Sequence, residues 1–218
     1  MVSTKIQSEQ HEIRQCENEA CRFRFPVIIS HPRKSWCPKC NATTVRVHLL
    51  NNSPESNRKT NQHQPRKVIG LLDNIRSILN VGSIFRTADG AGFEKLILSG
   101  ITATPLHPKL AKTGLGAEGL IPWEYTPNAL DTASELIHQG YSLWALEECD
   151  NAVSLFDYDR TIFPDSPVAL VVGNEITGVD PDILNLAHVK VWIPMNGSKR
   201  SLNVAVAFGI AAYNLSLK

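Results

Sequence analysis

The sequence predicts an α/β domain built on a parallel sheet with helices on both faces, preceded by a small cysteine-rich module. Four of the five cysteines fall within residues 11–50. Residues 51–66 contain no Ala, Val, Leu, Ile, Met, Phe, Tyr or Trp, so they bury too little apolar surface to fold and are predicted to be a polar linker. From residue 67 onward, runs of Val, Leu and Ile alternate with helix-like segments. We therefore expect a module at 1–50, a linker at 51–66 and a main domain at 67–218.

The first half of the main domain begins with two short apolar runs, at 68–72 and 95–98. They predict buried strands, because both faces of a parallel sheet are covered. Between them, Asn80 is predicted to cap a helix that runs to about Ala91, since asparagine is favoured at helix N-termini. Residues 106–120 are expected to be helical only in part. Residues 129–139 predict a regular helix that ends at Gly140.

The second half continues the same alternation. Runs at 141–146, 168–172 and 189–193 predict three more buried strands. Pro181 is predicted to begin a short helix, because proline is favoured at the first helical position. Residues 202–217 predict a closing helix rich in alanine and valine, whose small side chains allow close backbone packing.

The cysteines of the module form two close pairs, Cys16 with Cys21 and Cys37 with Cys40, separated by fifteen residues. Four thiolates suit a tetrahedral Zn²⁺ ion, and the Cys-Pro-Lys-Cys sequence at 37–40 is typical of zinc ribbons, which this segment resembles. Disulfides are the alternative, but the spacing and a reducing cytosol favour the metal. Because four protein ligands fill the coordination shell, the zinc is predicted to be structural. Cys149 is expected to be a core thiol rather than a nucleophile.

Charge is distributed unevenly along the chain. Residues 1–67 carry 12 Lys and Arg against 5 Asp and Glu, whereas residues 68–218 carry 10 against 16. A basic appendage on an acidic domain is expected to bind a polyanion. The alternative is that the basic residues of the module only contact solvent. Phe23, Phe25 and Trp36 lie among its basic residues, either packed around the ribbon or free to stack on bases. The sequence has no apolar run of membrane-spanning length and no secretory leader, so we expect a cytoplasmic protein.

Three separated segments combine glycine with polar residues where an ordinary core would be apolar. They are residues 80–88 (NVGSIFRTA), residues 173–178 (GNEITG) and residues 193–197 (IPMNG) followed by 201–207 (SLNVAVA). Each has a structural alternative when taken alone: a helix cap, a glycine turn or a tightly packed helix. Their order and intervals resemble the SpoU (TrmH-like) branch of the SPOUT RNA methyltransferases over about residues 68–218. Residues 112–118 add a weaker resemblance, for which a glycine-rich turn is the alternative.

The resemblance implies a domain with a deep trefoil knot that transfers a methyl group from S-adenosylmethionine to a ribose 2′-hydroxyl of tRNA or rRNA. It implies a homodimer in which the knot regions pair and the active site draws on both subunits. It places Arg86 at the reaction centre, where it either takes the proton or orients the hydroxyl. The other catalytic positions that it implies are Asn80, Glu175, Ser201 and Asn203. The implied cofactor positions are Leu146, Gly173, Ile193, Met195, Ser201 and Leu202, and no catalytic metal is required.

Three other functions compete with this interpretation. One is a SPOUT methyltransferase that modifies a base rather than a ribose. Another is a non-catalytic RNA-binding protein, which the joint presence of Asn80, Arg86, Glu175, Ser201 and Asn203 disfavours. The third is a doubly wound nucleotide-binding domain acting on a small molecule, but the sequence has no P-loop, and its Gly-x-Gly-x-x-Gly match at 114–119 does not directly follow a predicted strand.

Overall fold

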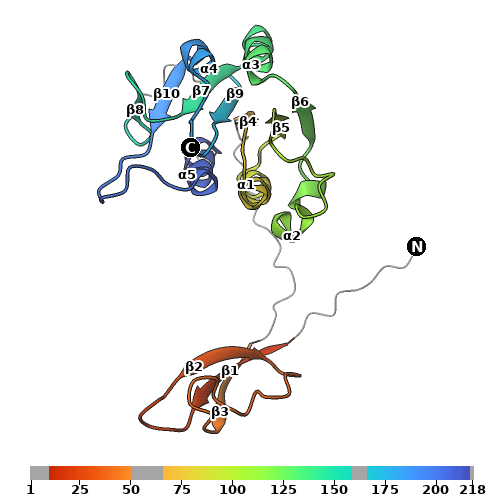
Figure 1. Cartoon of the computed structure of the whole chain (residues 1–218), viewed down its shortest axis with the longest axis vertical. Helices are drawn as coiled ribbons and strands as arrows, with labels where there is room; N and C mark the ends of the chain where they lie inside the picture. Colours follow the sequence, from red (N-terminus) through yellow and green to blue (C-terminus); the bar gives the residue numbers. More distant parts are fainter. Residues whose placement is uncertain (1–9, 51–65, 159–165, 217–218) are drawn as a thin grey trace, which may run out of the picture. The chain divides into compact units, whose positions relative to one another are not determined.

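A computed structural model describes residues 10–50, 66–158 and 166–216 of the chain. Contacts divide the chain into two compact units, Met1–Gln62 and His63–Lys218 (Figure 1). The predicted linker lies outside the described residues except for Arg66, as does Leu217 at the end of the predicted closing helix. No helix in the described ranges is long and apolar enough to cross a bilayer.

The first unit is a three-stranded antiparallel sheet in the order β2-β1-β3. Its strands are β1 (His11–Cys16), β2 (Arg24–Ile28) and β3 (Thr44–Leu50). Glu12 is buried on β1 and is balanced by Arg14, whose Nη1 lies 2.7 Å from Glu12 Oε1, and by Arg46 at 3.6 Å from Oε2. The hydrogen-bonded Arg14 guanidinium holds the pKa of Glu12 below its ordinary value, although burial acts in the opposite direction.

The second unit is built on a seven-stranded sheet in the order β6-β5-β4-β9-β7-β10-β8. All of its paired strands run parallel. The strands are β4 (Val68–Asp73), β5 (Lys95–Ser99), β6 (Trp123–Thr126), β7 (Ser142–Leu146), β8 (Val153–Ser154), β9 (Val168–Val172) and β10 (Val189–Trp192). The five predicted strands are all present, whereas β6 and β8 are additional strands at the two edges of the sheet.

Helices cover both faces of this sheet, as Figure 1 shows. The helices are α1 (Ile78–Ala91), α2 (Ala111–Gly114), the 3₁₀ turn η1 (Ala117–Gly119), α3 (Ala129–His138), α4 (Pro181–Leu186) and α5 (Val204–Ser216). Residues on alternate sides of β4 and β9 enter two cores. Leu72 and Val172 pack with α1 and α5, whereas Leu71 and Val171 pack with α3 and α4. The near-continuous apolar strands of the sequence therefore reflect burial on both faces.

The starts of two helices differ from the sequence prediction. Helix α1 begins at Ile78, and Ser77 rather than Asn80 occupies its N-cap, with Ser77 Oγ accepting from the Asn80 N–H at 3.4 Å. Helix α5 begins at Val204, and Asn203 Oδ1 accepts from the backbone N–H of Ala205 at 2.9 Å, which is the geometry of an N-cap. Asn80 is therefore not the cap, and its side chain makes contacts outside its own helix.

Candidate active site

Three loops meet at the carboxyl edge of the sheet because β9, β7 and β10 are neighbours and run parallel. Open α/β sheets commonly bind ligands outside this edge. The loops and the start of α5 enclose a cavity of about 430 Å³. Its wall consists of Leu146–Glu148 after β7, Val172–Ile176 and Gly178 at the end of β9, Trp192, Ile193, Met195 and Arg200–Asn203 after β10, and Val204 and Ala207 of α5.

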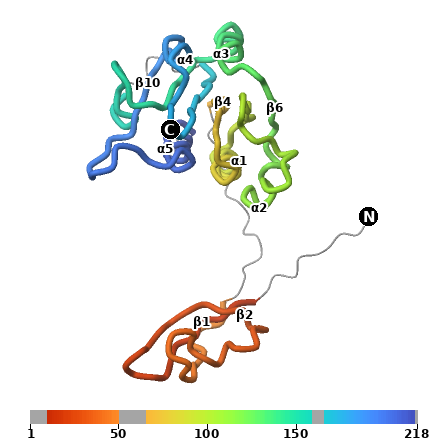
Figure 2. Tube along the Cα trace, in the orientation of Figure 1, coloured from red at the N-terminus to blue at the C-terminus, as the bar shows by residue number. Residues whose placement is uncertain are grey.

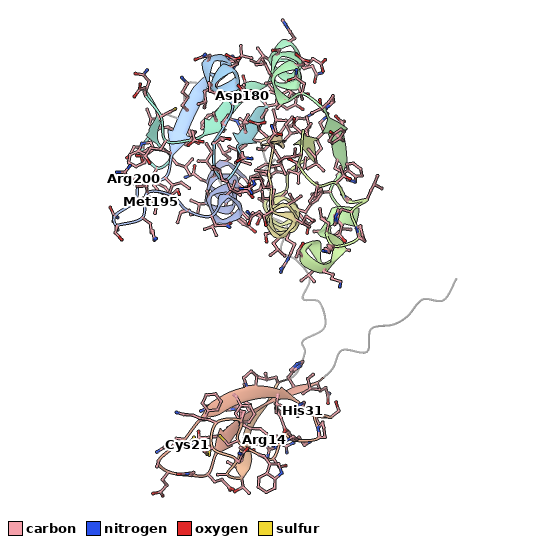
Figure 3. All side chains as sticks on the ribbon, viewed as in Figure 1. Arg14, Cys21, His31, Asp180, Met195 and Arg200 are labelled. Carbon is pink, nitrogen blue, oxygen red and sulfur yellow. The ribbon has the colours of Figure 1, made fainter. Side chains whose placement is uncertain are left out.

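The residues predicted to bind the cofactor all lie in this wall: Leu146, Gly173, Ile193, Met195, Ser201 and Leu202. They come from all three loops, so positions separated by more than fifty residues in the sequence share one cavity. The loop after β10 runs outward before it returns to α5, which can be followed in Figure 2. Met195 and Arg200 are labelled on this loop in Figure 3.

A chain of hydrogen bonds joins the three sequence motifs at the edge of the cavity. Asn80 Nδ2 donates to Glu175 Oε1 at 2.8 Å, and Asn203 Nδ2 donates to Asn80 Oδ1 at 2.9 Å. The side-chain oxygen Oδ1 of Asn203 in turn caps α5 by accepting from the Ala205 N–H. The structure thus brings together three of the predicted catalytic residues, and each is fixed by another.

The Glu175 carboxylate is held at the start of α1. Its Oε2 accepts from the Arg76 N–H at 2.8 Å, and its Oε1 accepts from the Ser77 N–H at 3.0 Å. Partial burial acts to raise the pKa of Glu175, but these hydrogen bonds and the one from Asn80 outweigh it, and the pKa lies below its ordinary value. Glu175 is therefore an anion that organises the site rather than a proton donor near neutral pH.

Glycine at position 173 is required by the fold of the loop itself. A Cβ atom there would lie 2.2 Å from the backbone carbon of Gly178, because the loop folds back through a bridge between Asn174 and Gly178. Asn174 fixes this turn: its Oδ1 accepts from the Ile176 N–H at 2.9 Å, and its Nδ2 donates to the Asn74 carbonyl at 2.8 Å. Of the two glycines in this loop, only Gly178 has a positive φ, of 74°. The close approach at Gly173 is thus between two protein segments.

Arg86 lies outside the cavity wall. It is exposed on α1, and no hydrogen bond or ion pair joins it to another residue in the described part of the chain. It lies six positions after Asn80, which corresponds to about 9 Å along the helix and a different helical face. Ser201 lines the cavity and is exposed. The structure therefore brings Asn80, Glu175, Ser201 and Asn203 to the cavity and leaves Arg86 away from it.

Several wall residues were not singled out from the sequence. Glu147, Glu148 and Arg200 are the other ionisable groups of the wall, and Asn174 is the residue that shapes the loop after β9. The two glutamates directly follow a buried strand, and this position at a carboxyl edge is the one signal that would have identified them. Cys149, expected in the core, is only partly buried, and that burial raises the pKa of its thiol.

Residues 112–118 have a packing role. A Cβ atom on Gly82 of α1 would lie 2.0 Å from Thr113 Oγ1, so this glycine lets α2 approach α1 closely. Glu118 Oε2 accepts from the Gly116 N–H at 3.0 Å and closes the glycine-rich turn. No residue of this segment belongs to the cavity wall.

In the first unit, the four predicted metal ligands converge. The Sγ atoms of Cys16, Cys21, Cys37 and Cys40 all lie within 4.8 Å of one another. Two of the separations are 3.4 Å (Cys16–Cys40) and 3.9 Å (Cys21–Cys37), close to the roughly 3.8 Å edge of a tetrahedron with 2.3 Å zinc–sulfur bonds. Burial raises the pKa of Cys37, but hydrogen bonds from the N–H groups of Cys40 and Lys39 outweigh it and bring the pKa to about 7. The donor set and its geometry fit a Zn²⁺ ion.

Comparisons with known proteins agree with this architecture. Residues 67–213 match the model of the SpoU rRNA Methylase family. The tRNA (guanosine(18)-2′-O)-methyltransferase of Aquifex aeolicus is 32% identical over 72% of this chain and 72% of that protein. The 23S rRNA (guanosine(2553)-2′-O)-methyltransferase RlmP of Bacillus subtilis is 32% identical over 69% of this chain. The match covers 58% of the RlmP chain and 57% of a TrmH family methyltransferase from Staphylococcus haemolyticus, a little over half of each.

Solved structures have the same fold. An AdoMet-bound rRNA methyltransferase from Sinorhizobium meliloti superposes with a TM-score of 0.64 and 30% identity, over 70% of this chain and 56% of that one. The TrmH/SpoU tRNA modifying enzyme of A. aeolicus gives a TM-score of 0.60 and 31% identity, over 69% and 74% of the two chains. The SPOUT fold class predicted from the sequence is confirmed. The chain belongs to the SpoU rRNA methylase family.

Proposed function

We propose that this protein transfers a methyl group from S-adenosylmethionine to a ribose 2′-hydroxyl of tRNA or rRNA. The observation that carries the proposal is the hydrogen-bonded chain from Glu175 through Asn80 to Asn203, because it assembles all three family motifs around one cavity. The names of the A. aeolicus and B. subtilis relatives specify 2′-O-methylation, one of tRNA and the other of rRNA. They favour a ribose over a base and leave both RNA classes as candidate substrates.

The cavity fits S-adenosylmethionine in size and chemistry. Its volume of about 430 Å³ lies within the range of about 300–1,000 Å³ found for small-molecule sites. Leu146, Ile193 and Leu202 supply apolar surface for an adenine ring, and the loop backbone supplies hydrogen-bonding groups. When bound, the cofactor supplies an electrophilic methyl group. We assign its binding to Leu146, Gly173, Ile193, Met195, Ser201 and Leu202.

The residues of this protein would orient the acceptor ribose for loss of its hydroxyl proton. Methyl transfer forms an O–C bond as the S–C bond breaks, so the hydroxyl proton must leave the oxygen. Asn80, Glu175 and Asn203 would hold the site in a fixed arrangement, and we assign contact with the ribose to Ser201, which lines the cavity. Because Arg86 lies away from the cavity of its own subunit, we propose that it acts at the cavity of a second copy. There its cationic side chain orients the hydroxyl or stabilises the developing oxyanion, and a phosphate of the RNA accepts the proton.

A homodimer would also cover apolar surface. Helix α5 is apolar around its circumference, which is typical of a helix covered on more than one side. One face packs in the core through Phe208 and Leu215, yet Val206 and Tyr213 are 52% and 44% exposed. Leu79, on the neighbouring helix α1, is 65% exposed. A second copy seated on α1 and α5 would bury these side chains.

We assign the four-cysteine cluster to a structural Zn²⁺ ion and the module at 1–50 to RNA affinity. Arg24, Arg33 and Arg46 are exposed on the module, and Trp36 is 52% exposed, so at least this aromatic ring is free to stack on a base. The linker at 51–66 and the catalytic domain at 67–218 complete the proposed organisation. RNA modification of this kind accords with residence in the cytoplasm.

The decisive experiment is transfer of a labelled methyl group from S-adenosylmethionine into total tRNA and rRNA, followed by mapping of 2′-O-methylated nucleotides. We expect incorporation at one ribose, a loss of at least about 10²-fold in Arg86→Ala, and a dimeric mass by sedimentation for both proteins. A methyl group found on a base would favour the base methyltransferase. RNA binding without cofactor binding in calorimetry would favour the non-catalytic protein. A monomeric mass would refute the shared site.

A second experiment addresses the module. Deletion of residues 1–62 is expected to weaken RNA binding at physiological salt while cofactor binding by the remaining domain persists. The salt dependence of RNA binding should also become shallower, because fewer cations contact phosphate. An unchanged affinity and an unchanged salt slope would show that the module does not contact the RNA.

A further inference from the structure

The ionisable side chains of the cavity wall are unbalanced in charge. Three are carboxylates, Glu147, Glu148 and Glu175, and one is a guanidinium, Arg200. The Glu175 carboxylate is hydrogen-bonded at the start of α1, where two backbone N–H groups and the Asn80 side chain donate to it. The hydrogen-bonded chain described above therefore leaves Glu147 and Glu148 unaccounted for.

Glu147 is fixed by one oxygen and open at the other. Its Oε2 accepts from the Val179 N–H at 3.0 Å. The carboxylate also lies against Gly178, where an added Cβ would come within 2.5 Å of Oε2. No hydrogen bond joins Oε1 to any residue in the described part of the chain. The side chain thus connects the loop after β7 to the loop after β9, and it keeps one acceptor available in the cavity wall.

Glu148 follows directly and is exposed at the cavity. Two adjacent carboxylates on one loop make that side of the wall anionic. Arg200 lies on the loop after β10, so the opposing charge belongs to a different segment (Figure 3). The anionic side of such a wall strengthens the binding of a cationic ligand by electrostatic attraction. It strengthens the binding of a neutral ligand of the same shape much less.

The two ligands of the proposed reaction differ in this property. S-adenosylmethionine carries a sulfonium, an ammonium and a carboxylate, so it is a net cation. After transfer, the sulfur is a neutral thioether and S-adenosylhomocysteine has no net charge. Resting on the proposed function, we infer that Glu147 and Glu148 make this cavity select the cationic cofactor over its neutral product. The preference opposes product inhibition and speeds exchange after each transfer.

The test compares two ligands in matched variants. Glu147→Gln keeps an oxygen that accepts from the Val179 N–H and removes the charge, and Glu148→Gln removes the second charge. Dissociation constants for S-adenosylmethionine and S-adenosylhomocysteine are measured by calorimetry on the full-length protein. Glu135→Gln, an exposed carboxylate on α3 outside the cavity wall, is the control. Thermal unfolding of each variant establishes that it is folded.

We expect the affinity for S-adenosylmethionine to fall about three- to tenfold in each cavity variant, whereas that for S-adenosylhomocysteine changes less than about twofold. Glu135→Gln should change neither. Raising the ionic strength should reduce the selectivity of the wild type and leave that of a double variant, Glu147→Gln with Glu148→Gln, unchanged.

Equal weakening of both ligands would overturn the inference, because Glu147 would then serve only to hold the two loops together. Unchanged binding of both ligands would overturn it as well. Failure of the wild-type protein to bind either ligand would overturn the proposed function, and the inference with it. Binding of both with unaltered selectivity in the variants would overturn the inference alone.

Discussion

Asn80 is the residue on which the three motifs depend. It bonds to Glu175 and Asn203, which lie 95 and 123 positions away along the chain. An amide can donate to the carboxylate on one side and accept from the second amide on the other. Aspartate at this position would lose the donor and place a second negative charge beside Glu175, and alanine would lose both bonds.

Asn80→Ala is therefore expected to lower the rate of methyl transfer by roughly 10²-fold, because misplacement of site residues by about an ångström has effects of that size. Asn80→Asp should be at least as impaired. Initial rates at saturating cofactor measure the effect. Gln139→Ala, at an exposed amide next to the C-terminus of α3, is the control and should retain full activity. A rate for Asn80→Ala within about twofold of wild type would contradict the proposed role of the hydrogen bonds from Asn80 to Glu175 and Asn203.

Glu175 gives a dependence of stability on pH. Its pKa is lower in the folded protein than the ordinary value of 4.5. Its contribution to the free energy of unfolding is therefore complete above that value and is lost as the pH falls through the folded pKa. Urea unfolding of wild type and Glu175→Gln should differ at neutral pH, with the wild type more stable. The difference should shrink below pH 4.5. A difference that grows on acidification would refute this assignment.

At the scale of elements, the loop after β9 has the tightest backbone constraint of the site. Gly173→Ala would place a methyl group 2.2 Å from the backbone of Gly178, where no flexible side chain can yield. We expect a loss of about 3 kcal/mol in the free energy of unfolding, together with loss of cofactor binding. Gly119→Ala is the matched control, because a Cβ there meets nothing within 4 Å and its φ is not positive. Denaturant unfolding that ranks the two variants equally would contradict the prediction.

The buried elements were predictable, whereas the edges were not. Residues 68–72 and 168–172 are apolar on both faces, so their strands follow from composition alone. Strand β6 carries exposed Glu124 and Tyr125, and β8 is two residues long, so neither gives an apolar run. The cap of α1 was misplaced because Ser77 and Asn80 are both good capping residues, and local sequence does not choose between them.

Only those residues of the candidate site that belong to a sequence motif could be predicted. The resemblance supplied Asn80, Glu175 and Asn203, but the bonds among them depend on how distant segments pack, which no local pattern encodes. Glu147 belongs to no motif, and its contact with Val179 exists only in the folded loop. The exposure of Arg86 away from the cavity was likewise not foreseeable, because the motif specifies its position in the sequence and not the direction of its side chain.

At the scale of the whole molecule, two units are stabilised by different means. The second unit has two apolar cores, whereas on the first unit the residues of β3 after Thr44 are exposed. So small a sheet needs another source of stability, which we assign to the metal.

Removal of zinc by a chelator is therefore expected to unfold the module and leave the second unit folded. Calorimetric scans should lose or shift one transition and retain the other, and cofactor binding should persist. Cys37→Ser should behave like the chelated protein, with about one fewer zinc ion per chain by elemental analysis. Cys149→Ser should bind as much zinc as wild type. A chelated protein with an unchanged near-ultraviolet spectrum would exclude a structural metal.

The bond between Asn80 and Asn203 also sets when the cavity can exist during synthesis. Its wall includes residues between Leu146 and Ala207. Asn80, which links the motifs, cannot form its bond to Asn203 until the ribosome has added 123 further residues. A growing chain thus contains a nearly finished sheet without a usable pocket, since contacts this distant close last. Ribosome-bound chains that stop before α5 should fail to retain S-adenosylmethionine, and chains carrying α5 followed by a linker long enough to bring it out of the ribosome should retain it. The progress of translation would then determine when the cavity becomes able to bind the cofactor.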